Sequence, residues 1–68
     1  MQEFKLKSEY IELLKLLKLL GIAETGGHAK IIVEEGGVFL NGKQEFRKRA
    51  KLRSGDKIEV FGKTILIH

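Results

Sequence analysis

Apolar residues recur with a helical period over residues 9–20. Four of them follow the i, i+3, i+4, i+7 spacing of one helix face: Tyr10, Leu13, Leu14 and Leu17. Three further leucines widen this face, so we expect the helix to pack against both a second helix and a sheet. Ser8 is the predicted N-cap, because its hydroxyl suits the free N–H groups of a first turn, and Gly21 is the predicted end.

A second, shorter helix is predicted between two pairs of glycines. Thr25 is its candidate N-cap, and its apolar face is formed by Ala29, Ile32 and Val33. Gly36 or Gly37 ends it, as glycine commonly does. The opening pair, Gly26 and Gly27, lies inside the first turn, where glycine costs helix stability. Another reason must therefore favour glycine there.

Alternating apolar and polar residues predict short strands around these helices. Residues 3–6 suggest an edge strand, and residues 38–44 read as a hairpin turning at Asn41-Gly42. Residues 43–52 are polar without a clear period, so an irregular strand and loop are expected. Residues 57–61 and 64–68 form the last two predicted strands. The expected fold is α+β in the order β-α-α-β-β-β-β: two adjacent N-terminal helices packed on a small, mostly antiparallel sheet of four to five strands.

The charge of the chain is concentrated in its second part. The 68 residues carry a net charge of +4 and are expected to form one domain, residues 1–68. Residues 1–42 have a net charge of −1, whereas residues 43–68 have a net charge of +5. Most of the excess lies in residues 43–53, with six basic residues and one acid. Such a block suits a polyanionic partner, or it is simply a solvated face.

Few residues suit catalysis or metal binding. Cysteine is absent, and His28 and His68 are the only histidines, so neither a metal site nor a cofactor is expected. Ser8 and Ser54 fit a cap and a turn, and no nucleophile–base pair can be assigned, so we expect no catalytic residues. The N-terminal residues lack a signal-peptide pattern, and residues 13–23 are too short to cross a bilayer. A cytoplasmic protein without a membrane partner is expected.

One ordered set of motifs resembles a known family. It comprises Leu20-Gly21 ending a leucine-rich helix, a second helix over residues 25–35, a strand with Asn-Gly over residues 38–42, a basic run over residues 47–51, and Gly55-Asp56 before a closing strand. Together, residues 13–60 resemble the S-four domain, an RNA-binding domain named after the fourth protein of the small ribosomal subunit. The Gly-Gly-X-Ala-Lys run from Gly26 is similar to its stand-alone bacterial subgroup.

The resemblance implies a non-catalytic protein that binds structured RNA through its two helices and the following hairpin. Ribosomal RNA or the ribosome is the first expectation and tRNA a second, with the protein a monomer. Many members carry Ser-Arg where this chain has Thr25-Gly26, which removes one expected phosphate contact. The candidate RNA-binding residues are Lys15, Lys18, Thr25, Gly26, Gly27, His28, Lys30, Lys43, Arg47, Lys48, Arg49 and Lys51.

The resemblance also offers a reason for the glycines that open the second helix. A helix N-terminus presents free N–H groups and the positive end of the helix dipole, and glycine lets a phosphate come close. Lys30 would add charge and His28 a donor. The competing hypothesis is that Gly26 and Gly27 allow tight helix–helix packing, with His28 an ordinary surface residue.

Two other functions fit parts of the sequence. Residues 38–43 and 52–61 are similar to sulfur-carrier proteins of the β-grasp type, but those need a C-terminal Gly-Gly and this chain ends in "ILIH". A protein-interaction adaptor is the other alternative, with the basic block facing an acidic partner.

Overall fold

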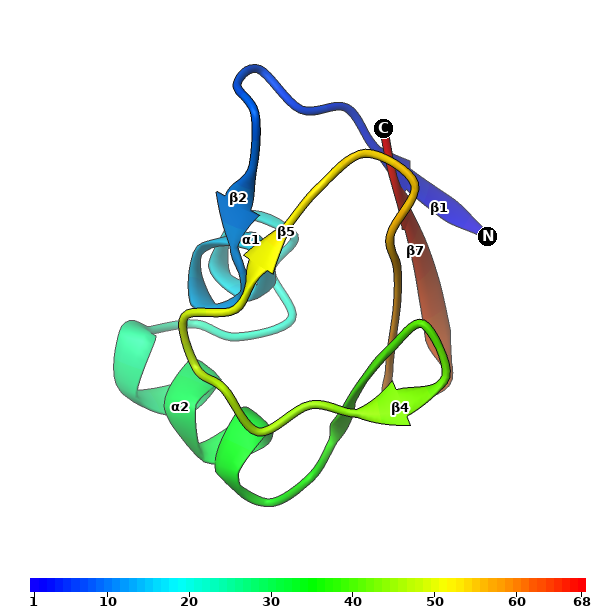
Figure 1. Ribbon diagram of the computed structural model, residues 1–68. Helices are drawn as coiled ribbons and strands as arrows, with labels where there is room; N and C mark the ends of the chain where they lie inside the picture. Colours follow the sequence, from blue (N-terminus) through cyan, green and yellow to red (C-terminus); the bar gives the residue numbers. More distant parts are fainter.

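The computed structural model describes all residues, 1–68, as two helices and seven short strands (Figure 1). The helices are α1 (Leu13–Leu19) and α2 (Gly26–Glu34). The strands are β1 (Gln2–Phe4), β2 (Ile11–Glu12), β3 (Val38–Leu40), β4 (Lys43–Gln44), β5 (Lys51–Leu52), β6 (Lys57–Val60) and β7 (Lys63–Ile67). In Figure 1 the helices occupy the left side of the molecule and the β1–β7 edge the right side.

The strands form two sheets of different size. The larger has the order β1-β7-β6-β3-β4, with β1 parallel to β7 and every other pair antiparallel. This arrangement confirms the predicted α+β class and the mostly antiparallel sheet. The smaller sheet is an antiparallel ribbon of β2 and β5, which lies in front of α1 in Figure 1. The predicted element order had five strands and lacked both β2 and β5, the two strands of this ribbon.

The core lies between the helices and the larger sheet and is entirely apolar. Fifteen buried hydrophobic residues form one cluster, and no polar or charged side chain is buried. On α2 the buried residues are Ala29, Ile32 and Val33, which confirms the predicted face. In β6 and β7 burial alternates along the strand, as expected for a sheet with one covered face.

The beginning of the first helix differs from the prediction. Ser8 is not the N-cap, because its Oγ donates to the carbonyl oxygen of Tyr10 at 2.9 Å. The helix starts four residues later than expected, after Glu12, whose side chain makes no capping bond. Ile11 and Glu12 are extended because they pair with β5, so tertiary pairing overrides the helical period of this segment. Tyr10 is consequently exposed and does not join the core.

The helix ends follow the sequence closely. Gly21 has a φ of 73° and Gly36 a φ of 79°, both in the left-handed region that favours glycine. After α1, the Gly21 N–H donates to Lys18 O and the Ile22 N–H donates to Leu17 O, each at 3.0 Å. These bonds satisfy carbonyls that the helix leaves free, as in the Schellman motif. Gly21 and Gly36 are therefore confirmed as helix stops, and Asn41-Gly42 joins β3 to β4 as predicted.

We predict that Gly36→Ala destabilises the protein. A Cβ at Gly36 would collide with the amide of Gln44, whose Nε2 donates to Gly36 O at 2.8 Å, and the left-handed backbone disfavours it further. The expected loss is about 1–2 kcal/mol, or a fall of roughly 4–15 °C in Tm by thermal denaturation. The control is Gly27→Ala, where the added Cβ meets only Thr25 Oγ1 at 3.8 Å. Equal melting temperatures for the two variants would contradict this account.

Candidate nucleic-acid interface

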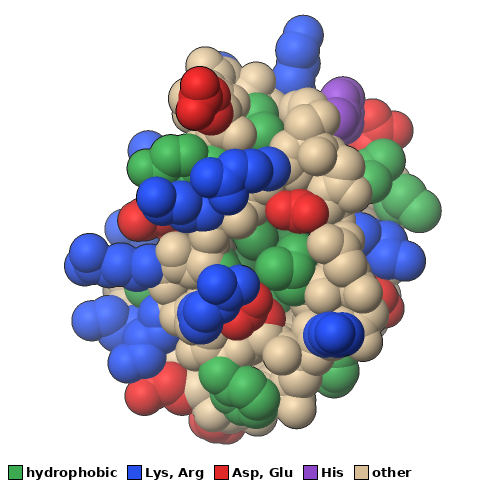
Figure 2. Space-filling model, viewed as in Figure 1, with side chains coloured by type: hydrophobic (Ala, Val, Ile, Leu, Met, Phe, Trp, Pro, Cys, Tyr) green, Lys and Arg blue, Asp and Glu red, His purple; other side chains and the backbone are tan.

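The basic block of residues 43–53 runs from the edge of the larger sheet to the β2–β5 ribbon. It starts in β4, crosses in front of α2 and ends just after β5 (Figure 1). Figure 2 shows Lys and Arg side chains gathered over the left side and centre of this face, around the β2–β5 ribbon. None of the six basic side chains of the block is buried. The charge asymmetry of the sequence therefore becomes a surface feature of the fold.

The ribbon aligns three of these cations in one row. Ile11 lies opposite Leu52 in the register, and both side chains are buried. Because neighbouring residues of a strand point to opposite faces, Lys51 and Arg53 point outward. Ala50 is also buried, and Arg49, in the turn that precedes it, is exposed. Arg49, Lys51 and Arg53 thus follow at every second position along one exposed face.

A shallow hollow lies beside this row. It is lined by Arg47, Arg49, Ala50, Lys51 and Arg53, and we refer to it as the basic hollow. Four of its five residues are cationic and none is acidic. A concave surface lined by one sign of charge concentrates ions of the opposite sign. The structure brings together the predicted Arg47, Arg49 and Lys51, and adds Arg53, which the sequence analysis had missed.

Two cations of the block are tied to acids, and the others are not. Arg47 donates to both oxygens of Glu45, from Nε to Oε2 at 3.1 Å and from Nη2 to Oε1 at 3.0 Å. The Arg47 guanidinium holds the pKa of the Glu45 carboxyl below its usual value, and Glu45 raises the pKa of Arg47. Lys48 pairs with Glu34 of α2 at 3.5 Å.

The three cations of the row are not neutralised by neighbouring acids. Arg49, Lys51 and Arg53 form no ion pair within 4 Å. Asp56 is close to Arg53 in the chain, but its Oδ2 accepts from the backbone N–H of Arg53 at 2.8 Å. The row therefore offers full positive charges to a ligand without first breaking a salt bridge.

The start of α2 forms a second group of predicted residues. Thr25 is confirmed as the N-cap, since its Oγ1 accepts from the His28 N–H at 3.0 Å. His28 Nδ1 accepts from the N–H of Glu24, the residue before the N-cap, at 3.2 Å. The N–H groups of Gly26 and Gly27 have no backbone or side-chain acceptor.

The glycines of this turn are not needed for packing. A Cβ on Gly26 would meet nothing within 4 Å, and one on Gly27 would meet only Thr25 Oγ1. The hypothesis that they allow tight helix–helix packing is therefore wrong. Their open side faces solvent, which leaves room for a ligand beside the free N–H groups.

The remaining predicted residues are exposed but separate. Lys15 and Lys18 lie on α1, Lys30 lies on α2 and Lys43 lies on β4, and none of them borders the basic hollow. Glu34, one turn after Lys30 on α2, forms its salt bridge with Lys48. The predicted residues thus divide into three that line the basic hollow, the start of α2, Lys48 beside Glu34, and four lysines elsewhere.

Two other hollows differ from the basic hollow in their lining. The hollow next to Tyr10 combines Lys5, Lys7 and Lys15 with the acid Glu12.

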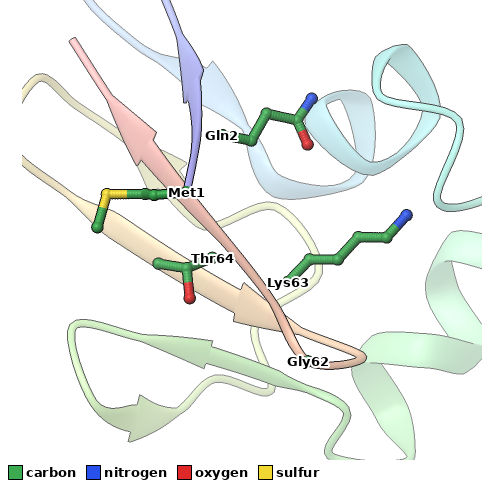
Figure 3. A pocket seen from close by; sticks show the side chains of 5 residues that line it. All are labelled: Met1, Gln2, Gly62, Lys63 and Thr64. Atoms are coloured by element: carbon green, nitrogen blue, oxygen red, sulfur yellow. The ribbon is translucent and has the colours of Figure 1, made fainter.

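The other hollow lies at the β1–β7 edge and is lined by Met1, Gln2, Gly62, Lys63 and Thr64. Figure 3 shows that the side chains of Met1 and Thr64 point to one side, and those of Gln2 and Lys63 to the other. They do not converge on a common ligand. No three His, Cys, Asp or Glu side chains are grouped as metal ligands would be, and neither helix is long and apolar enough to cross a membrane.

Comparison with known proteins identifies relatives that span almost the whole chain. The family model of the S4 domain matches residues 4–68. Two proteins, "Putative RNA-binding protein YbcJ" of Escherichia coli (strain K12) and "Uncharacterized protein YbcJ" of Shigella flexneri, are each 40% identical over 61 residues. These matches cover 90% of this chain and 87% of each relative.

A solved structure agrees with the same assignment. The solution structure of YbcJ from E. coli is similar with a TM-score of 0.73 and 40% identity, covering 98% of this chain and 86% of that one. It is described as revealing an ALFAL motif involved in RNA-binding. The resemblance inferred from the motifs is confirmed, and this chain belongs to the S4 domain family.

Proposed function

We propose that this protein binds structured RNA without catalysing a reaction, with ribosomal RNA, free or in the ribosome, as the first candidate and tRNA as the second. The observation that carries the proposal is the row of Arg49, Lys51 and Arg53, three cations without ion pairs beside a hollow that has no acid. Phosphate groups supply most of the affinity of proteins for nucleic acids. The RNA-binding descriptions of the E. coli relative support the same ligand.

The start of α2 supplies a second phosphate site in this proposal. The free N–H groups of Gly26 and Gly27 and the positive end of the helix dipole attract an anion. Because His28 Nδ1 accepts a hydrogen bond, a neutral His28 carries its proton on Nε2, where it can donate to a phosphate oxygen. Thr25 acts indirectly, by fixing the turn that presents these donors.

The spread of the charges favours a folded RNA over a short single strand. Cations lie on α1, α2, β4 and β5, so one ligand can meet all of them only if it presents phosphates over a broad surface. Double-stranded RNA is recognised mostly by shape and by contacts to its backbone. We accordingly propose modest sequence specificity, with the protein acting as a monomer in the cytoplasm. An acidic protein partner would use the same charges, and a test with nuclease separates it from RNA.

RNA binding should weaken steeply as salt is added. With about six phosphate contacts, the slope of log K against log salt should be about −4 to −5. A fluorescence anisotropy titration of a structured ribosomal RNA fragment at several salt concentrations measures this slope. Absence of binding at low salt, or a flat salt response, would contradict the proposal. Co-purification of a protein that persists after nuclease treatment would favour the adaptor function.

The position of the charges should matter more than their number. We predict that Arg49→Gln with Lys51→Gln lowers RNA affinity and makes the salt slope shallower by about one to two units. Both side chains are exposed, so the free energy of unfolding should change by no more than about 0.5 kcal/mol.

The matched control removes the same charge from outside the proposed surface. Lys57→Gln with Lys63→Gln changes two exposed lysines in β6 and β7, outside the basic hollow. This pair should reduce affinity less than the first. Equal losses from the two pairs would mean that net charge alone attracts RNA, and the proposed surface would be wrong.

A further inference from the structure

One aromatic side chain joins the outward face of the β2–β5 ribbon. Tyr10 directly precedes β2, so continuation of the register places it opposite Arg53 and diagonal to Lys51. The Lys51 Nζ lies 4.9 Å from the centroid of the Tyr10 ring, and the Arg53 Cζ lies 5.8 Å from it. Both distances fall within the range of cation–π attraction. A single ring therefore contacts two cations of the basic hollow.

The nearby acids Glu12 and Asp56 do not form ion pairs with these two cations. Glu12 is opposite Lys51 in the register, yet the two form no ion pair. Asp56 accepts from the Arg53 backbone N–H and from Asn41 Nδ2. Lys51 and Arg53 repel each other and neither forms an ion pair, but the charged group of each lies over the face of Tyr10. The ring offsets part of this repulsion without neutralising either charge.

The backbone of Tyr10 is held in place by the fold. Ile11, the next residue, is anchored in the core, and the Ser8 Oγ donates to the Tyr10 carbonyl oxygen at 2.9 Å. The position of Tyr10 is thus defined from both sides of the chain. Two cations at alternate positions of a strand are roughly 6.5–7 Å apart along the backbone. This spacing is comparable to that between successive phosphates of an RNA strand.

We propose that Tyr10 is a positioning residue that holds Lys51 and Arg53 ready for neighbouring phosphates at the basic hollow. This inference deepens the proposed RNA binding and rests on it. Long cationic side chains lose conformational freedom when they bind a phosphate. A ring that has already restricted them reduces this loss, and so raises affinity without touching the ligand.

Stacking of an RNA base on Tyr10 is a different use of the same ring. The Tyr10 side chain is already flanked by two cations and its residue is only 37% exposed, which limits the face open to a base. A ligand with phosphates but no bases separates the two uses. Linear inorganic polyphosphate is such a probe.

The experiment compares Tyr10→Leu, Tyr10→Phe and the unchanged protein, each titrated with the ribosomal RNA fragment and with polyphosphate. Tyr10→Leu removes the π face and should lower the affinity for both ligands by about two- to fivefold, the range that corresponds to an exposed cation–π contact. Tyr10→Phe keeps the ring and should bind both ligands like the unchanged protein. Phe39→Leu is the matched control, since Phe39 is 40% exposed on β3 and should not affect either ligand.

A second comparison tests whether Tyr10 acts through the two cations. In a protein that already carries Lys51→Gln and Arg53→Gln, Tyr10→Leu should cause no further loss of affinity. Thermal melts check that each variant is folded, and Tyr10→Gln replaces Tyr10→Leu if the latter does not fold.

Each other outcome has a defined meaning. If Tyr10→Leu lowered the affinity for RNA but not for polyphosphate, the positioning role would be overturned in favour of base stacking. The positioning role would also be overturned if Tyr10→Leu left both affinities unchanged, or if Tyr10→Phe lowered them as much as Tyr10→Leu does. Tyr10-dependent binding of polyphosphate without RNA binding would support the positioning role while contradicting the proposed function. Failure to bind either ligand would contradict both.

Discussion

The pairing of β2 with β5 is the contact on which the rest of this small structure depends. It turns Ile11 and Leu52 into the core, and the Leu13 N–H at the start of α1 donates to Ala50 O at 2.9 Å. The same alternation sends Lys51 and Arg53 to the outside, where no salt bridge neutralises them. Burial of apolar residues and display of charge are therefore two faces of one ribbon.

Much of the fold was predictable because its signals are local. The Thr25 cap, the Gly21 and Gly36 stops and the Asn41-Gly42 turn each depend on residues close together in the chain, and each was found where expected. Glycine and capping residues have strong backbone preferences of their own. The alternation in residues 57–67 likewise gave two strands with one buried face.

The rest depended on contacts between distant residues. Tyr10 fits the helical period of the leucines, and only the pairing with β5, about 40 residues away, shows that it precedes a strand. Arg53 was missed for the same reason. The alternation of Arg49, Ala50, Lys51, Leu52 and Arg53 was the available signal, but a two-residue strand within a charged block is too short to stand out. Which cations are tied to Glu34 or Glu45 is a matter of tertiary distance alone.

We propose that the β2–β5 ribbon and the start of α2 together form the RNA-binding face. NMR titration of the isotope-labelled protein with the structured ribosomal RNA fragment tests it residue by residue. We expect the largest amide shift changes in residues 25–28 and 49–53, with little change along β1 and β7. Dominant changes along β1 and β7, with residues 49–53 unaffected, would contradict it.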